Sequence, residues 1–516
     1  MTLFADQKNL FSTNALNLAA ILLSSILFAA GAAQARSSLD LTAQAFEEAK
    51  VSRPELVHFL QGFPKGADLH NHLDGSVFSE HALHSATQKG LNYDLVANAF
   101  TTADLSNSVI NLDALKQSSD YFRAFREAFS IRAWKQVSGS GRDQFFGVFG
   151  RIASSQISEG TMLRNSIRQA NAQNIQHLEL IAPVVPADVQ DKFNAALVNF
   201  DINDLESAYT QVADLIGQES VNTSIKTRID GWEAEGFVDV KNQPDSASVR
   251  YIGYIIRVIG LRDFFIATVS NLAAVNADDR VVSLTLVVPE DLPAAIADFD
   301  NQMKIIDFLW QKMGQPNLSL HAGELNLEDA TLDVMKDRIR KSIDLGHSRR
   351  IGHGVSIAWE NNAADLLTQM ANNKTLVEIC LTSNEAILDI QGRDHPFDLY
   401  RKYKVPMSLN TDDEGVSRSP LTLEFVKAVE RYNLSYADVL ELARNSLEYS
   451  FLSGDSLFDA GDFSKPIASF KRYDFVDGEL SSEQQLLLSN NPKLQTQVKF
   501  ERELAAFEAK FISGGR

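Results

Sequence analysis

The sequence of 516 residues predicts an α/β protein: a (β/α)8 TIM barrel with a helical insertion after its first strand and a C-terminal helical extension. Three observations support this prediction. Short β-rich segments recur eight times, each followed by sequence of helical character, which is the repeat of such a barrel. Histidines and acidic residues end several of these segments, where barrel enzymes hold their reactive groups. A barrel with insertions also reaches this length as one domain.

The first part of the chain, residues 1–35, is expected to be a signal peptide. Lys8 precedes a long apolar stretch that ends in Ala33-Gln34-Ala35, the small-x-small pattern of a cleavage site. This predicts export to the periplasm or secretion. An uncleaved membrane anchor is the alternative, because the apolar stretch is nearly long enough to span a bilayer. No later segment has such a run, so we expect no stable membrane insertion once the leader is cleaved.

The barrel is expected over residues 64–455, after an N-terminal segment at 36–63 and before a C-terminal extension at 456–516. Its eight strands are predicted at 66–72 and in the segments that begin at Ile175, Val249, Arg280, Leu318, Arg349, Thr375 and Val405.

Two connections and the extension are longer than a simple barrel requires. The insertion, at about 77–170, contains amphipathic aromatic-rich segments such as YFRAFREAF, which predict several helices over the barrel mouth. The connection at 183–248 is expected to form one long helix and a polar loop. The charged amphipathic KFERELAAFEAKF segment of the extension predicts a helix on the outside of the barrel or at a subunit contact, so a homo-oligomer is possible but its state is left open.

Composition restricts the partners. The net charge of −19 argues against nucleic acid as the main partner, because phosphates require clustered basic residues, but it does not exclude a single nucleoside or another weakly charged small molecule. Cys380 is the only cysteine, so no intrachain disulfide can form, and its apolar surroundings predict a buried side chain rather than a nucleophile.

The first predicted strand contains His70 and His72 in the run ADLHNHLDGS. Side chains at positions i and i+2 of a strand point to the same side, so the two imidazoles can share a metal ion. Alone, such a pair is more often polar surface or satisfied core histidines than a metal site. Its interpretation therefore depends on metal-competent residues elsewhere in the chain.

Further metal-competent residues end three other predicted strands. His321 ends one of them and is followed after two small residues by Glu324; His353 ends another between two glycines; Asp412 and Asp413 end the last. Each alone is more commonly a hydrogen-bonded core histidine, a turn or a helix cap. Together they predict a site for a divalent ion such as zinc, which accepts imidazole and carboxylate ligands and leaves a position open for water.

In order along the chain, the motifs KGADLHNHLDGS, SLHAGE, RIGHG, TSN and SLNTDD resemble those of the adenosine deaminase family of metal-dependent aminohydrolases, including its secreted members. The resemblance runs from about Pro64 to Leu452. It implies that one Zn²⁺ per chain is held by His70, His72, His321 and Asp412.

The resemblance also implies roles for the neighbouring residues. His353 orients the metal-activated water and takes its proton, and Asp412 helps to aim the nucleophile. Glu324 acts as an acid towards the purine N1, for which a closed pocket must raise its pKa. Asp413 contacts N7, and Asp74 contacts the ribose hydroxyls.

The sequence departs from the family pattern at three places. Glu414 stands where the family usually has proline after the paired aspartates, so the loop is expected to follow a different path. Leu381 follows Cys380 where proline is usual. Val288 occupies the place of a glycine whose backbone contacts the purine N3, and its bulk is expected to narrow the pocket.

The resemblance implies zinc-dependent hydrolytic deamination of adenosine, and of 2'-deoxyadenosine, to the inosine product and ammonia. Val288 motivates an alternative in which the substrate is adenine or a modified aminopurine. An alternative of another class is a non-catalytic extracellular binding or signalling protein on the same fold. AMP is disfavoured, because no basic cluster near the strand ends is available for its phosphate.

Overall fold

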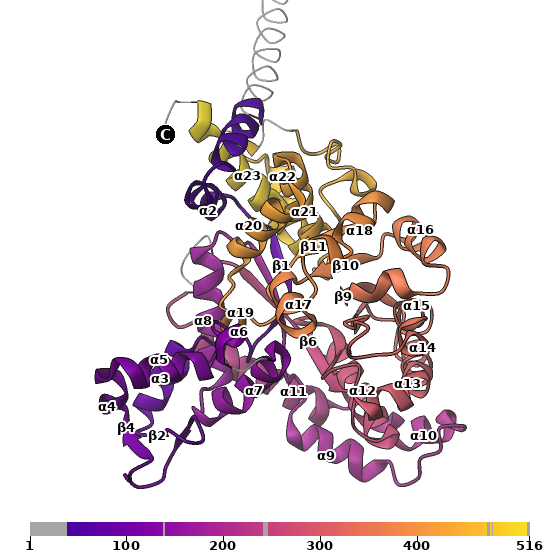
Figure 1. Cartoon of the computed structure of the whole chain (residues 1–516). Helices are drawn as coiled ribbons and strands as arrows, with labels where there is room; N and C mark the ends of the chain where they lie inside the picture. Colours follow the sequence, from indigo (N-terminus) through magenta and orange to yellow (C-terminus); the bar gives the residue numbers. More distant parts are fainter. Residues whose placement is uncertain (1–38, 138–139, 241–245, 472–474, 477, 513–516) are drawn as a thin grey trace, which may run out of the picture.

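The computed structural model describes residues 39–137, 140–240, 246–471, 475–476 and 478–512 (Figure 1). The predicted leader lies outside the described residues. Among the helices that are described, none combines the length and apolar character needed to cross a membrane.

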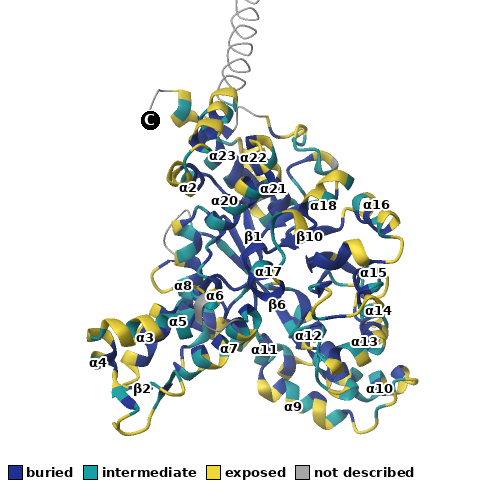
Figure 2. Cartoon of the chain, viewed as in Figure 1, coloured by how far each residue is buried: buried dark blue, intermediate teal, exposed yellow. Residues whose placement is uncertain are grey.

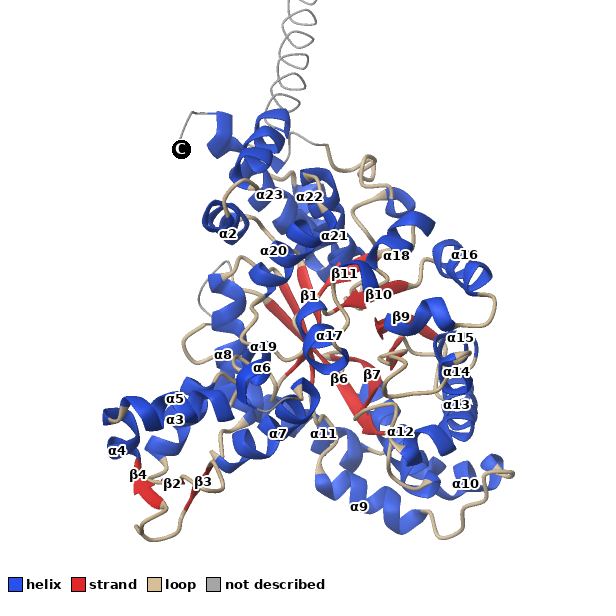
Figure 3. Cartoon of the chain, viewed as in Figure 1, coloured by secondary structure: helices blue, strands red, loops and turns tan. Residues whose placement is uncertain are grey.

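The centre of the molecule is a ring of eight parallel strands in two hydrogen-bonded sets of four (Figure 3). The first set is β1 (Ala67–His72), β5 (His177–Ile181), β6 (Ser248–Ile256) and β7 (Val281–Val287). The second is β8 (Leu318–Ala322), β9 (Ser348–His353), β10 (Leu376–Ile379) and β11 (Met407–Leu409). Each of the eight matches one of the segments that the sequence predicts to be strands, although β6 and β9 each begin one residue earlier than predicted.

The ring is closed by hydrogen bonds at two junctions between the sets. Between β11 and β1, the Asp412 amide donates to the His70 carbonyl at 2.9 Å, and the His72 amide donates to the Asp412 carbonyl at 2.8 Å. Between β7 and β8, the Ser319 amide donates to Ser283 Oγ at 3.1 Å. The predicted (β/α)8 barrel is therefore confirmed, with its strands buried among the surrounding helices (Figure 2).

Helices connect the strands around the ring. After β6, β7, β8 and β9 come α12 (Leu261–Ala277), α13 (Pro293–Lys312), α14 (Leu332–Met335), α15 (Arg338–Asp344), η2 (Val355–Trp359) and α16 (Ala363–Asn373). After β10 and β11 come α17 (Leu381–Leu388), η3 (Gly392–Asp394), α18 (Phe397–Tyr403), α19 (Glu414–Ser417), α20 (Leu421–Tyr432) and α21 (Tyr436–Glu448).

The insertion between β1 and β5 is mostly helical, as predicted. Its helices are α3 (Ser79–Gln88), α4 (Leu112–Gln117), α5 (Ser119–Ala128), α6 (Trp134–Val137), α7 (Gly141–Ser154) and α8 (Glu159–Ala172). It also contains an antiparallel sheet that we did not predict, formed by β2 (Asn92–Asp94), β3 (Ala99–Thr101) and β4 (Val109–Asn111). Tyr93 and Phe100 pair across this sheet and pack on Phe125, so its short strands are stabilised by tertiary contacts rather than by local periodicity.

The connection between β5 and β6 corrects a second expectation. The stretch predicted as one helix and a loop forms α9 (Ala187–Ala196), α10 (Leu205–Val212), η1 (Ala213–Leu215) and α11 (Glu219–Gly236). In α11, Val221, Ile225, Ile229 and Trp232 are buried at helical spacing between polar residues. The polar composition concealed this narrow apolar face.

The C-terminal extension contains η4 (Asp459–Gly461), α22 (Ser482–Ser489) and α23 (Pro492–Ile512). Helix α23 packs on the outside of the barrel, as predicted. The Phe507 ring lies 5.1 Å from that of Phe59 in α2 (Arg53–Gly62) and 5.8 Å from that of Phe63, measured between centroids. This contact joins the two ends of the described chain beside the start of β1.

Candidate metal centre

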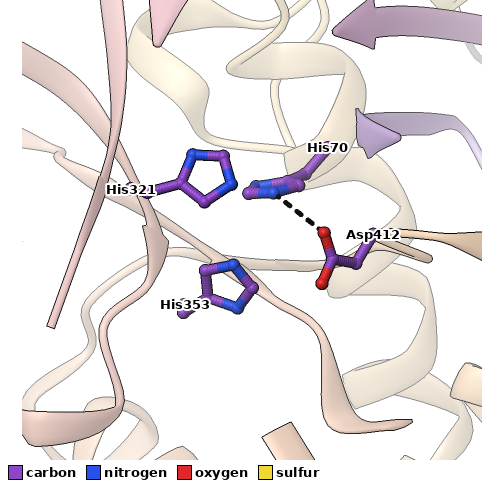
Figure 4. Close-up of side chains that lie close together, drawn as sticks. All are labelled: His70, His321, His353 and Asp412. Carbon is purple, nitrogen blue, oxygen red and sulfur yellow. Dashed lines mark ion pairs between the residues drawn. The ribbon is translucent and has the colours of Figure 1, made fainter. Parts of the chain in front are cut away.

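The predicted metal-binding side chains converge at the carboxyl ends of the barrel strands. His70, His321, His353 and Asp412 are buried and place one nitrogen or oxygen each within 4.8 Å of all the others (Figure 4). His72, which is partly exposed, forms a second such group with Asp412 and Asp413. Four strands from both halves of the barrel therefore contribute to one centre.

The four predicted ligands share close contacts around Asp412. Its Oδ1 atom lies 3.4 Å from His70 Nε2 and 3.3 Å from His72 Nε2. His72 Nε2 also lies 3.3 Å from His321 Nε2. The structure thus brings together all four residues, and it places the imidazole of His353 beside them.

Partners behind His70 and His321 orient their rings. His70 Nδ1 donates to Glu378 Oε2 at 2.8 Å, and His321 Nδ1 lies 2.8 Å from the Thr285 hydroxyl. These bonds occupy Nδ1 and leave Nε2 of each ring directed towards the centre, as is usual for metal-ligating histidines. Glu378 is in turn held by Ser319 Oγ, which donates to its Oε1 at 2.7 Å, and by Arg350 Nε, 2.7 Å from that atom.

The electrostatics of the centre favour a cation. Burial disfavours charge on His70, but Asp412 and Glu378 together raise its pKa to about 10. Burial would raise the pKa of Asp412, but the neighbouring histidines hold it well below its usual value. Burial and the charges of neighbouring histidines keep the pKa of His321 well below normal, so its nitrogen lone pair is available. This donor set, with His70 Nε2 buried and lacking a hydrogen-bond partner among the described residues, fits a divalent ion.

The backbone is strained where it presents the site. His353 has φ of 66° and Asp412 has φ of 58°, in the left-handed region that most side chains avoid. Val288, at the end of β7, has φ of 79°, which is unusual for a β-branched residue. The backbone at position 288 therefore has a conformation that glycine adopts without strain.

Glu324 has the environment predicted for a protonated acid. Burial, then the charges of Asp412 and Glu290, raises its pKa well above normal. Its Oε1 atom is buried with no hydrogen-bond partner among the described residues and lies 3.6 Å from His353 Nδ1. Its backbone amide donates to Glu290 Oε1 at 3.1 Å, which fixes the turn after β8.

Asp413 follows β11, and Asp74 follows β1. Burial, then the charges of Asp412 and Asp74, raises the pKa of Asp413 well above normal. Its carboxylate packs on Gly75, where a Cβ atom would lie 1.5 Å from Oδ1. Asp74 is exposed and accepts the Gly75 amide at 3.0 Å, so it stands at the rim.

The sequence of this chain is similar to those of adenosine deaminases. The adenosine deaminase family model matches residues 208–458. An adenosine deaminase of Enterococcus faecalis is 32% identical over 139 residues, 27% of this chain but only 38% of that protein. One from Clostridium perfringens is 24% identical over 406 residues, 76% of this chain and 96% of the relative. The solved structure of an adenine deaminase from Arthrobacter aurescens aligns with 17% identity and a TM-score of 0.47, over 76% of this chain and 94% of that one.

Proposed function

The chain belongs to the adenosine deaminase family of metal-dependent aminohydrolases, and on this premise we propose that it deaminates adenosine and 2'-deoxyadenosine by zinc-dependent hydrolysis. Water adds at C6 of the purine and ammonia leaves, which gives the inosine product. The observation that carries the proposal is the convergence of His70, His72, His321 and Asp412 beside a partly buried acid, Glu324.

The four ligand candidates would hold the ion through Nε2 of each histidine and a carboxylate oxygen of Asp412. Bound there, zinc supplies a water whose pKa is lowered towards neutrality. The contacts of Glu378 and Thr285 keep two of the ligand rings oriented, so little reorganisation is required when the substrate enters.

Three carboxyl groups would bind the substrate. Glu324 holds a proton that it donates to the purine N1, which withdraws electrons from C6 and favours attack there. Asp413, whose pKa is also raised, donates to N7. Asp74, at the rim, accepts from the ribose hydroxyls.

The exchange Glu324→Gln separates chemistry from metal binding. Glutamine preserves the shape of the side chain but removes the acidic proton, so zinc content should be unchanged while kcat on adenosine falls by roughly 100-fold or more. Ammonia release and zinc per chain are measured on the purified mature protein. Full activity of the variant would show that Glu324 is not the acid. If the wild-type protein releases no ammonia from adenosine, adenosine is not its substrate.

A second candidate substrate is adenine or a modified aminopurine, favoured by the bulk of Val288 at the strained end of β7. Comparing kcat/KM on adenosine and free adenine decides between them, because a pocket shaped for ribose loses binding energy with the base alone. Higher kcat/KM on adenine would replace the first proposal by the second.

We also propose that the protein is exported and that its leader is removed after Ala35. Mass spectrometry of the protein recovered from outside the cytoplasm should give a mature chain that begins at Arg36. An intact chain recovered only with membranes would favour the uncleaved anchor.

A further inference from the structure

A chain of hydrogen bonds leads from a backbone amide to the imidazole of His353. The Phe397 amide donates to His395 Nδ1 at 3.2 Å, and His395 Nε2 lies 3.2 Å from Asn384 Oδ1. Asn384 Nδ2 lies 3.0 Å from His353 Nδ1. All of these residues are buried, so water does not compete for the bonds.

The direction of this chain follows from its first member. A backbone N–H can only donate, so His395 Nδ1 must offer its lone pair. Burial and the charge of Arg431 lower the pKa of His395 to about 3, so its ring is neutral and carries its single proton on Nε2. That proton is donated to Asn384, which fixes the amide with its oxygen towards His395 and its NH₂ group towards His353.

We propose that Asn384 and His395 are positioning residues that hold His353 as the tautomer with its proton on Nε2. Because Asn384 donates to Nδ1, the neutral ring of His353 has its N–H at the other nitrogen. Figure 4 shows that this other nitrogen is directed towards His70 and His321. His353 therefore presents a proton to the metal centre, not a lone pair.

The contrast with the neighbouring histidines supports this assignment. Nδ1 of His70 faces the carboxylate of Glu378, and Nδ1 of His321 faces the hydroxyl of Thr285, and both of these groups can accept a hydrogen bond. His353 Nδ1 faces an amide NH₂ group instead. In the same centre, His70 and His321 are thus oriented as metal ligands, whereas His353 is oriented as a hydrogen-bond donor. The remaining histidine ligand of the metal is therefore His72 and not His353.

The inference rests on the proposed deaminase function and refines it in two ways. The N–H of His353 orients the oxygen of the attacking water and stabilises negative charge on it, in place of the proton-accepting role that the family resemblance implies for this residue. In addition, the bond from Asn384 occupies the Nδ1 lone pair, which lies 3.6 Å from Glu324 Oε1. His353 is thereby prevented from taking the proton that Glu324 must deliver to the substrate.

The tautomer can be observed directly by NMR of histidine-labelled, full-length mature protein without substrate, with His353 assigned by the variant His353→Asn. The ¹⁵N shifts should identify a protonated Nε2 and an unprotonated Nδ1. In Asn384→Asp the carboxylate can only accept, so the proton should move to Nδ1. A wild-type ring protonated on Nδ1, or an unchanged pattern in Asn384→Asp, would overturn the inference. This readout is independent of any deaminase activity, so it distinguishes failure of the inference from failure of the proposed function.

Kinetics test whether the tautomer matters. Asn384→Asp should lower kcat roughly 100-fold while KM changes less than about threefold and zinc content is retained. His395→Gln keeps an N–H donor near the place of Nε2 and should preserve the tautomer and most of kcat, whereas His395→Leu should lose both. Equal losses in the two His395 variants, or an unchanged kcat in Asn384→Asp, would contradict a positioning role.

Asn445→Asp provides the matched control for folding. Asn445 is also a buried amide, and its Nδ2 donates to the Met407 carbonyl at 3.1 Å, at the opposite end of β11 from Asp412. Its replacement should lower the melting temperature about as much as Asn384→Asp but leave the His353 tautomer unchanged. A tautomer change in this control would show that general loosening of the fold, and not Asn384, moves the proton.

Discussion

Val288 combines a β-branched side chain with a backbone φ of 79° at the carboxyl end of β7. The left-handed conformation costs a residue with a Cβ atom about 1–2 kcal/mol, and glycine avoids this cost. The strain lies at the rim of the candidate active site, where such conformations are commonly retained because they place functional groups.

Replacing Val288 by glycine should therefore leave the free energy of unfolding within about 1 kcal/mol of the wild type, because relief of strain offsets the larger chain entropy of glycine. The same change at Val287, a regular strand residue paired with Ile256, should destabilise by more than this. Urea denaturation of both variants measures the difference. Equal destabilisation would show that Val288 is not strained.

Glu414, at the start of α19, should make folding stability depend on pH. Burial, then the charge of Asp68, raises its pKa to about 8 from an ordinary value of 4.5, against an opposing hydrogen bond from Gln173. Between these values the folded protein retains a proton that the unfolded chain has released, so the contribution of Glu414 falls as pH rises.

The variant Glu414→Gln cannot titrate and should escape this loss. Its melting temperature should exceed that of the wild type by more at about pH 8 than at about pH 5. Scanning calorimetry of both proteins at the two pH values checks this. A constant difference between the proteins would mean that the carboxyl group is already ionised in the folded state at the lower pH.

The sequence predicted the reactive residues better than the residues that orient them by hydrogen bonds. His70, His321 and Asp412 stand out because metal-competent side chains follow β-rich segments. Glu378 had a weaker signal, an acidic residue inside an apolar strand, and it went unrecognised as the partner of His70. Asn384 had no signal of its own, because an amide that fixes a tautomer is indistinguishable in sequence from any polar residue.

At the scale of elements, long periodic segments were predictable and short ones were not. The strands of the barrel are apolar runs, and all eight were found. The three-residue strands β2, β3 and β4 are too short to show alternation, and they form because Tyr93 and Phe100 pack on the helices of the insertion. Helix α11 was missed because only a narrow stripe of its surface is apolar.

The helix α7 of the insertion contacts the loops that follow two barrel strands. Arg142 Nη2 lies 2.5 Å from Asp291 in the loop after β7, and Nη1 lies 3.4 Å from Asp329 in the loop after β8. The neighbour of Asp291, Glu290, accepts the backbone amide of Glu324. Arg142 thus connects the insertion to the turn that carries the proposed acid.

Removing this connection with Arg142→Ala should raise KM for adenosine several-fold. The melting temperature should change by only a few degrees, because partly exposed ion pairs contribute about 1 kcal/mol or less to stability. Arg123→Ala is the control, since Arg123 pairs with Asp120 on the exposed surface of α5 and contacts no barrel loop in the described ion pairs. Steady-state kinetics with both variants tests the link. Equal KM values in both would show that the contact does not hold the insertion over the site.

At the scale of the whole molecule, the barrel brings together residues that are far apart in the sequence. The bridge between Asn71 and Asp412 closes the ring and places β1 beside the end of β11. The sequence predicts a barrel and therefore this convergence, but not which histidine is a ligand and which is a donor. That distinction depends on side-chain partners contributed by other strands and helices.

A zinc titration of the metal-free protein, with conversion of adenosine to inosine and ammonia as the readout, tests zinc-dependent deamination most directly. We expect no turnover without metal and a linear rise in turnover that ends at one zinc ion per chain, a level that His70→Ala and His321→Ala should not reach. Full activity of the metal-free protein, or a protein that binds one zinc ion and still leaves adenosine unchanged, would show that the chain is not a zinc-dependent adenosine deaminase.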